Sequence, residues 1–379
     1  MEDRLKGLVD GNSETNRKKW AMEWKKQGKK VIGVMSSYVP EEVISAAGML
    51  PFRITGTWQE NISRARVYYH VESNCAYCNH VLESFLSGEL DFLDGIIATD
   101  QDDVLRVTFE VLEYLKKKPF SCLIHIPFFE SELNYRYFAG EIRRLITRLE
   151  DFSGVKITED SMHSSIDTYN QMRDLLNQVY EMRKKEIPPL SGAEALGIIT
   201  TAQVMPKENF NSELETLLPY LEKRQTNLKQ VHPRLLLSSD HLDDQRYLEL
   251  VEESCLIAMD DMDTGIRYFI KNVENDLEDP AYALAKRYLS RHGAPNIAHW
   301  DRQAEQLIKW VKEYNIDGIL SLPITWCYSQ TYRMPWLSRE LEKAGIPSIS
   351  LEREYQLANA GQLRTRIGAF LEMLGTKKQ

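Results

Sequence analysis

The stretch that decides the fold is KKVIGVMSSYVPEEVISAAGMLPFRITG, residues 29–56. It opens with an apolar run rich in β-branched side chains, which predicts a strand. Pro40, Glu41 and Glu42 then indicate a helix start, because proline suits the first turn and carboxylates suit the positive end of the helix dipole. Gly48 marks the end of that helix, and LPFRITG predicts a second strand. Strand, helix and strand in this order predict a parallel βαβ unit.

The same alternation recurs on both sides of a different middle segment. FLDGIIATD and FSCLIHIPF predict two further strands in the first half, and PRLLLSSD, CLIAMDD, DGILSLPIT and PSISLERE predict four in the second. Residues 132–186 are charged and almost free of Gly and Pro, which predicts helices. We therefore expect an α/β protein with two Rossmann-like or flavodoxin-like domains that contain parallel sheets. The expected parts are a first domain with an N-terminal helix at 1–130, a helical segment at 131–192, and a second domain with a C-terminal helix at 193–379.

Composition narrows the function classes. The 379 residues are 43% hydrophobic, which is enough for two cores, and the net charge is −9. An acidic protein has no general attraction for nucleic acid or anionic membranes. The sequence has no apolar run of about 18 residues, and its first residues lack the apolar core of a signal peptide, so we expect a cytoplasmic protein without a membrane span. Five cysteines are too few for a disulfide scaffold, which leaves reduced thiols, metal ligation or redox chemistry.

Polar residues follow several of the predicted strands. Parallel sheets bind ligands beyond the carboxyl ends of their strands, so these positions are the first candidates for a site. They are Ser36, Ser37 and Tyr38, then Asp100 to Asp103, then Ser238 to Asp240, and finally Thr325 to Cys327. A cleft between the two domains would gather several of them.

The cysteines divide into two groups. Cys75 and Cys78 form a C-x-x-C at a predicted helix start, where the helix dipole favours thiolate, although the surrounding sequence is not thioredoxin-like. Redox or ligand function and simple packing both remain open for this pair. Cys327 follows a predicted strand, whereas Cys122 and Cys255 lie in strands and are expected in the core. The run from Asp100 to Asp103 either binds a cation or caps the helix that follows it.

Three blocks of sequence together resemble one known family. The stretch KVIGVMSSYVPEEVISAAGMLPFRITG resembles its N-terminal signature, and SGELDFLDGII and AGIPSISLEREYQLANAGQLRTRIGAFLEML resemble its middle and C-terminal blocks. The family is that of the 2-hydroxyacyl-CoA dehydratases and class I benzoyl-CoA reductases. The similarity extends from about residue 29 to residue 374, with the blocks in the right order.

The resemblance implies an oxygen-sensitive iron–sulfur subunit of a heterodimer, the smaller of the two subunits. In this family a [4Fe-4S]-type cluster is held by three cysteines, and a separate ATP-hydrolysing activator protein supplies one electron at low potential. The electron reaches an acyl-CoA thioester, a ketyl radical forms, and the result is dehydration of a 2-hydroxyacyl-CoA or reduction of an aromatic ring. The implied partners are a homologous second subunit, the activator and the acyl-CoA substrate.

Carried over by position, the first cluster cysteine falls on Cys75 and the third on Cys327, where the family's Cys-Asp-Pro is Cys-Tyr-Ser. The second falls on Asp102, in Asp-Asp-Val-Leu-Arg instead of a Cys-Asp-x-x-Arg segment. Three alternatives follow. Asp102 is itself a ligand, although a carboxylate is a harder donor than a thiolate; or Cys78, one helical turn from Cys75, replaces the missing thiolate; or the cluster is altered or absent and the subunit supports a catalytic partner.

The resemblance also implies roles for four other residues. Ser36 and Ser37 lie in the loop that corresponds to the active-site loop, so we expect them beside the cluster and the thioester oxygen. Gln362 and Arg364 are candidates for contacting CoA phosphate or ordering the C-terminal helix. Two rival functions remain, a binding or scaffolding subunit without a redox centre and a thiol oxidoreductase that uses Cys75 and Cys78.

Overall fold

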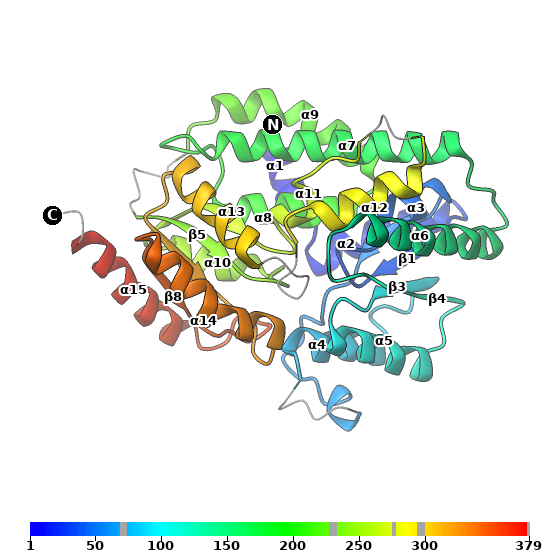
Figure 1. The fold of residues 1–379 in the computed structure, drawn as a ribbon, viewed down its shortest axis with the longest axis horizontal. Coiled ribbons are helices and arrows are strands. Elements are labelled where there is room, and N and C mark those ends of the chain that lie inside the picture. Colours follow the sequence, from blue (N-terminus) through cyan, green and yellow to red (C-terminus); the bar gives the residue numbers. More distant parts are fainter. Residues whose placement is uncertain (69–73, 227–232, 275–277, 294–299, 377–379) are drawn as a thin grey trace.

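Figure 1 presents the computed structural model, which describes residues 1–68, 74–226, 233–274, 278–293 and 300–376. Two four-stranded sheets organise the chain, and both are parallel. The first has the order β2-β1-β3-β4 and the second the order β6-β5-β7-β8. The same order thus occurs twice. The predicted α/β fold with two Rossmann-like or flavodoxin-like sheets is confirmed.

The first sheet is formed by the part of the chain that begins with the predicted βαβ unit. Its strands are β1 (Val31–Val34), β2 (Leu50–Arg53), β3 (Gly95–Thr99) and β4 (Phe120–Ile124). The elements that connect them are α3 (Glu41–Ala46), η1 (Ala65–Val67), α4 (Ala76–Leu86) and α5 (Asp103–Leu115). Strands β1, β2 and β3 are buried at every residue, as expected for a parallel sheet covered on both faces. In Figure 1, α4 and α5 lie below this sheet.

The second sheet repeats this plan. Its strands are β5 (Arg234–Ser238), β6 (Leu256–Asp261), β7 (Gly318–Ser321) and β8 (Ser348–Ser350). The helices of this half are α10 (Gln245–Glu252), α11 (Ile266–Phe269), α12 (Pro280–Ser290), α13 (Trp300–Glu313), α14 (Tyr328–Lys343) and the C-terminal α15 (Ala360–Thr376). Helix α14 begins six residues before the expected helix pattern MPWLSRELEKAG and continues through Pro335. Cys327 therefore lies directly at a helix start.

The remaining helices pack around the two sheets and against one another. They are α1 (Glu2–Val9), α2 (Glu14–Lys26), α6 (Glu132–Ser153), α7 (Glu159–Met182), α8 (Gly192–Ala202) and α9 (Lys207–Lys223). Helix α6 packs against α12, and α7 packs against both α3 and α9; α7 and α9 run along the upper edge of the molecule in Figure 1. Because the middle helices contact elements of both halves, the domain boundaries at residues 130 and 192 stay predictions.

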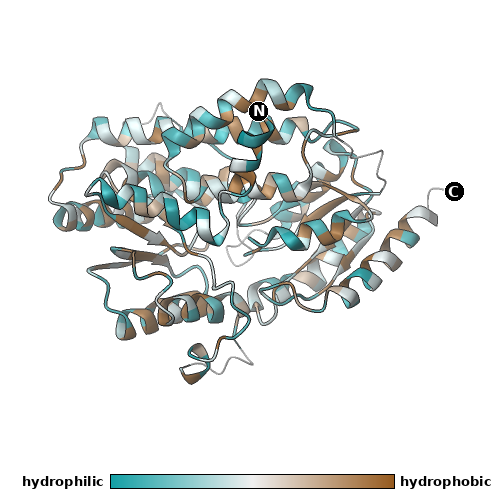
Figure 2. Ribbon diagram, turned by 180° about the vertical axis from the view of Figure 1, so that it is seen from behind, coloured by the Kyte–Doolittle hydropathy of each residue, from teal (hydrophilic) through white to brown (hydrophobic). Residues whose placement is uncertain are grey.

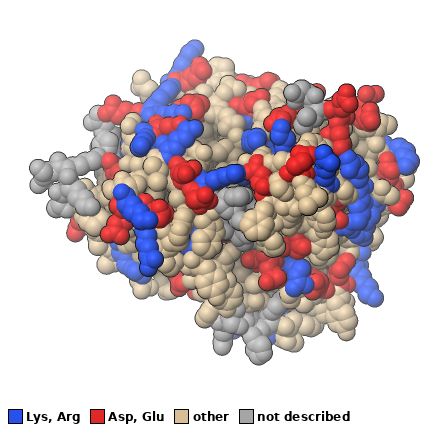
Figure 3. Space-filling view, viewed as in Figure 1, with Lys and Arg blue, Asp and Glu red and all other residues tan. Residues whose placement is uncertain are grey.

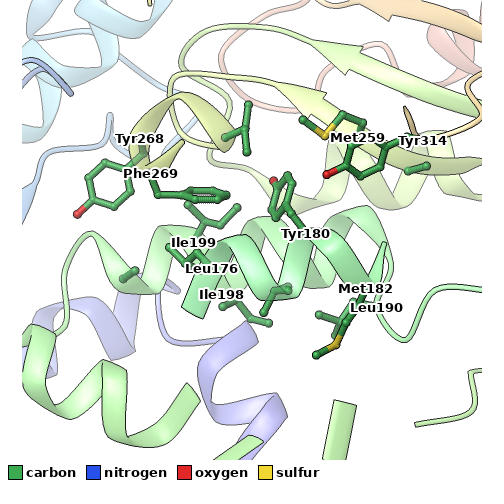
Figure 4. Close-up of a cluster of buried hydrophobic side chains, with 14 of the residues drawn as sticks. Leu176, Tyr180, Met182, Leu190, Ile198, Ile199, Met259, Tyr268, Phe269 and Tyr314 are labelled. Carbon is green, nitrogen blue, oxygen red and sulfur yellow. The ribbon is translucent and has the colours of Figure 1, made fainter. Parts of the chain in front are cut away.

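The hydrophobic core lies between these layers. Figure 2 shows apolar residues concentrated in the strands, with hydrophilic residues on the outer turns of the helices. One large cluster joins α7 and α8 to the second sheet and includes Leu176, Tyr180, Ile198, Met259 and Phe269 (Figure 4). On the face shown in Figure 3, cationic and anionic side chains are interspersed and do not form a patch of one sign. None of the helices within the described ranges is long and apolar enough to cross a membrane.

Candidate functional site

Three helices begin at one cavity, and each begins with a residue singled out from the sequence. Cys75 is the N-cap of α4, Asp102 the N-cap of α5 and Cys327 the N-cap of α14. Asp102 follows β3, and Cys327 follows β7, so both lie at the carboxyl end of a parallel strand, where ligands bind in such folds. The positive ends of three helix dipoles therefore face the same small space and favour negative charge there.

This space, which we call the thiol cavity, is lined by Cys75, Cys78, Asp102, Asp240, His241 and Cys327, among others. It encloses residues from both halves of the chain. The structure thus brings together all four residues that the sequence proposed as metal ligands. A backbone hydrogen bond of 3.2 Å from Ala76 N to Thr325 O fixes the start of α4 against the segment that leads into Cys327.

The three thiols contact one another through Cys75. The Cys75 thiol interacts with the thiols of Cys327 and Cys78, and all three cysteines are buried. The pKa of Cys75 lies well above its ordinary value: contact with Cys327 acts to lower it, but contact with Cys78 and burial outweigh that effect. Contact with Cys75 and burial likewise raise the pKa of Cys327. Cys75 and Cys327 are therefore protonated at neutral pH, and a metal would displace their protons on binding.

Asp102 has a second role that its position explains. Its Oδ1 accepts hydrogen bonds from the backbone N–H groups of Val104 at 2.9 Å and Leu105 at 3.1 Å. Burial raises the pKa of this carboxyl group. Asp102 is thus a helix cap that also borders the thiol cavity, and the cap uses only one of its two oxygens.

Ser36 and Ser37 lie behind the wall of the cavity. Both are buried, and each hydroxyl donates to a residue that lines the cavity: Ser36 to Gln101 Oε1 and Ser37 to Asp263 Oδ1. Asp263 also pairs with Arg53, and these two side chains are 2% and 3% exposed. The catalytic role expected of the serines stays a prediction, and any effect of theirs on the cavity would act through these two partners.

Gln362 and Arg364 lie elsewhere, on α15. Both are exposed, and Arg364 forms a two-pronged ion pair with Glu253, at 2.7 Å for each contact. Neither belongs to the described residues that line the thiol cavity. Their proposed role with CoA phosphate stays a prediction, and the observed ion pair agrees with the alternative role of ordering the C-terminal helix.

Tyr77, His241 and Asp263 are site residues that sequence reasoning missed. The Tyr77 ring stacks on the His241 ring, with centroids 3.9 Å apart and an angle of 8° between the planes. Burial lowers the pKa of His241 to about 4, and its Nδ1 lies 3.8 Å from Asp263 Oδ2, without a hydrogen-bond partner among the described residues. The only signal in the sequence was that His241 and Asp263 follow shortly after strands of the second sheet.

The side chains of the thiol cavity are of the chemical type that binds an iron–sulfur cluster, but their present arrangement does not suit one. Cysteine thiolates are the usual donors to iron–sulfur clusters, and this cavity brings three cysteines together. Within the described ranges, however, no group of three or more His, Cys, Asp or Glu side chains is arranged to hold a metal ion. The side chains around Cys75 would have to turn toward a common centre before they could bind one.

Comparison with known proteins places the chain among its relatives. The family model described as 2-hydroxyglutaryl-CoA dehydratase, D-component, matches residues 36–374. The chain belongs to this family. The resemblance found in the sequence is thereby confirmed, and the matched region contains the whole thiol cavity.

Relatives of the 2-hydroxyglutaryl-CoA dehydratase D-component family align with the chain over nearly its full length. The (R)-phenyllactyl-CoA dehydratase beta subunit of Clostridium sporogenes is 26% identical, over 95% of this chain and 96% of its own. One benzoyl-CoA reductase subunit, from Thauera aromatica, is 24% identical, over 93% and 94%. The beta subunit of (R)-2-hydroxyglutaryl-CoA dehydratase from Acidaminococcus fermentans is 25% identical, over 93% and 94%.

Proposed function

We propose that this chain is one subunit of a heteromeric enzyme that dehydrates a 2-hydroxyacyl-CoA or reduces an aromatic acyl-CoA. The observation that carries the proposal is the family match over residues 36–374, together with end-to-end alignment to proteins named as subunits of such enzymes. The partners are a homologous second subunit and an ATP-dependent electron-donating activator.

We further propose that the thiol cavity holds an iron–sulfur cluster through Cys75, Cys78 and Cys327. Cys75 interacts with both other thiols, which supports this set over one that includes Asp102. Asp102 remains the cap of α5 and a charged neighbour. When bound, such a cluster supplies one-electron transfer at low potential.

The chain's own residues prepare the cavity for that role. Three helix N-termini favour negative charge, which thiolate ligands carry. The stacked Tyr77 and His241 rings form one wall of the cavity. The Arg53–Asp263 ion pair holds Ser37, and Gln101 holds Ser36, so the loop after β1 keeps a fixed position.

The experiment is anaerobic co-purification. The chain is produced with its candidate partner subunit, the complex is weighed, and iron, sulfide and visible absorption are measured. A heteromer that contains iron and sulfide, and that acts on acyl-CoA once the activator and ATP are added, is the expected result. A homogeneous, fully active protein made of this chain alone would contradict the heteromeric proposal.

A supporting subunit without a cluster is the second candidate. It is favoured by one observation, namely that no three donors in the described ranges are arranged around a metal. In that case the complex would be active while this chain, separated from its partner without oxygen, contained no iron. Iron and sulfide in the separated chain would decide for the first candidate.

A further inference from the structure

A separate cavity lies at the carboxyl end of β2, between α2 and the end of α4. It has a volume of about 70 Å³, enough for several water-sized groups, since one water needs roughly 10–15 Å³. Its lining includes Arg17 and Lys18 of α2, and Thr55 and Trp58, which follow β2. We call it the Arg17 cavity. It shares no lining residue with the thiol cavity, so it is a site of its own.

Arg17 carries a positive charge that no described carboxylate balances directly. It is 7% exposed and forms no ion pair within the described ranges, whereas the buried Arg53 and Arg173 each pair with a carboxylate. Burial lowers the pKa of Arg17, and the charge of Asp243, the largest opposing effect, does not offset it. A buried charge without a partner is costly, so an unpaired guanidinium that lines a cavity indicates a missing counter-charge.

The Arg17 guanidinium has one nitrogen that a ligand can reach. Its Nη2 donates to the carbonyl oxygen of Arg53, and its Nε is enclosed without an acceptor. Its Nη1 also has no acceptor among the described residues, but it is not one of the enclosed atoms. The guanidinium carbon lies over the Phe52 ring, 4.7 Å from its centroid, which holds the group in place. Nη1 is therefore the donor that Arg17 offers to the cavity.

Two further donors line the same cavity. The Thr55 hydroxyl and the Trp58 indole N–H have no hydrogen-bond partner in the described part of the chain, and neither atom is enclosed. Thr55 is 5% exposed, and both residues follow β2, at the sheet edge where parallel folds bind ligands. Three unused donors of different kinds thus face one small space, which suits a ligand with oxygen acceptors.

The charges around the cavity favour a ligand with a single negative charge. Arg17 and Lys18 supply two positive charges, and Glu14 and Glu89 supply two negative charges. Neither carboxylate forms an ion pair with Arg17, and Glu89 instead accepts from the Thr57 hydroxyl at 2.7 Å. Because the four charges sum to zero, a carboxylate is accommodated with less repulsion than a phosphate, which brings a larger negative charge.

We propose that the Arg17 cavity binds a small monocarboxylate. Its oxygens accept from Arg17 Nη1, Thr55 Oγ1 and Trp58 Nε1, and its short carbon chain packs on the apolar surface of Leu90 and Phe92. The volume limits the acid to a few carbon atoms. This site goes beyond the proposed function and does not depend on it.

Saturation-transfer NMR on the full-length chain without oxygen tests the proposal, because it detects the protons of bound propionate. Propionamide, which has a similar size but no charge, and inorganic phosphate are added as competitors at equal ionic strength. We expect propionate to bind, and neither competitor to displace it at an equal concentration. Displacement by either one at an equal concentration would contradict the assignment of a monocarboxylate.

Two variants and one control locate the binding site. Arg17→Met removes the charge and should weaken propionate binding at least about tenfold. Thr55→Val removes one uncharged donor and should weaken it about twofold to tenfold. Arg136→Met is the control, because Arg136 lies on α6, is 73% exposed and pairs with Glu132. It should bind propionate as the wild type does.

Thermal unfolding separates a ligand-binding role of Arg17 from a purely structural one. Propionate should raise the unfolding temperature of the wild type and of Arg136→Met, but not that of Arg17→Met. Absent binding to the wild type, or equal affinity in folded Arg17→Met, overturns the proposal. If Arg17→Met does not fold, Thr55→Val decides: weaker binding supports the proposal, and unchanged binding overturns it.

Discussion

Cys75 and Cys327 lie side by side although they begin helices that belong to different sheets. Cys75 caps α4, which packs on the first sheet, and Cys327 caps α14, which follows β7 of the second. Their thiols interact directly. The thiol cavity therefore exists only when both halves of the chain are folded and in contact.

Replacing Cys75 or Cys327 by serine should abolish most of the bound iron. A serine oxygen is a harder and weaker ligand for cluster iron than a thiolate. Cys255→Ser is the matched control, because Cys255 is also buried but lies at the start of β6, where its Sγ donates to Val251 O. Iron and sulfide per chain, measured without oxygen, give the result; equal losses in all three variants would count against the proposed ligands.

Asp102→Ala should lower the free energy of unfolding by about 1 kcal/mol, the usual effect of removing a helix cap. Asp102→Asn keeps an oxygen that can accept from Val104 N and Leu105 N, so its stability should stay near that of the wild type. Urea denaturation measures both. Because we assign the ligands to the thiols, both variants should also retain iron. A folded Asp102→Asn protein that lacks iron would make Asp102 a ligand.

Asp263→Asn should destabilise the protein by about 3–5 kcal/mol, because it leaves the buried Arg53 guanidinium without its counter-charge. Burial acts to raise the pKa of Asp263, but Arg53, His241 and the hydrogen bond from Ser37 together outweigh burial and hold the pKa well below the usual value. The carboxylate therefore contributes stability above about pH 4, its unfolded pKa, and that contribution is lost as the pH falls below it.

The gap in stability between wild type and Asp263→Asn should accordingly narrow in acid, which urea denaturation at neutral and acidic pH would measure. Glu253→Gln provides a control, since its partner Arg364 is exposed and such pairs contribute at most about 1 kcal/mol. A constant gap across the acid range would argue that the ion pair does not set the stability of this region.

Gly56→Ala should destabilise the protein by about 1–3 kcal/mol, because the added Cβ would overlap His80 and would lie 2.7 Å from the ring of Tyr355. Gly7→Ala is the natural comparison: it lies inside α1, and no described atom comes within 4 Å of the new Cβ, so it should stabilise slightly. Thermal melts of the two variants that shift in the same direction would contradict this account.

Local patterns were sufficient to predict the sheets. Short apolar runs mark all eight strands, and the helix starts at Glu41 and Asp103 follow from the acidic residues there. Helices α8 and α9 were not assigned, because α8 is apolar on nearly every face and α9 contains Pro219. Both are stabilised by packing against α1 and α7, which no local pattern records.

Sequence alone could place a site residue only where that residue directly follows a predicted strand. Asp102 and Cys327 follow strands, so their place at the carboxyl edge could be expected. Two contacts of the site join residues from different halves of the chain: Tyr77 stacks on His241, and Arg53 pairs with Asp263. Nothing in the sequence indicates which distant residue each of these side chains will meet. Arg364 shows the converse, since its basic character suggested a phosphate, whereas its partner in the structure is Glu253.

The Arg53–Asp263 pair has a consequence for the order of events during maturation. Together with the hydrogen bond between Gly56 N and the Tyr355 hydroxyl, it joins the two halves through buried contacts that need no ligand. The apoprotein is thus expected to reach its compact form soon after synthesis, with the conformational entropy of bringing the halves together already lost. Iron and sulfide would then reach a cavity whose backbone is already folded. Only the thiol side chains would have to rearrange when the iron and sulfide bind.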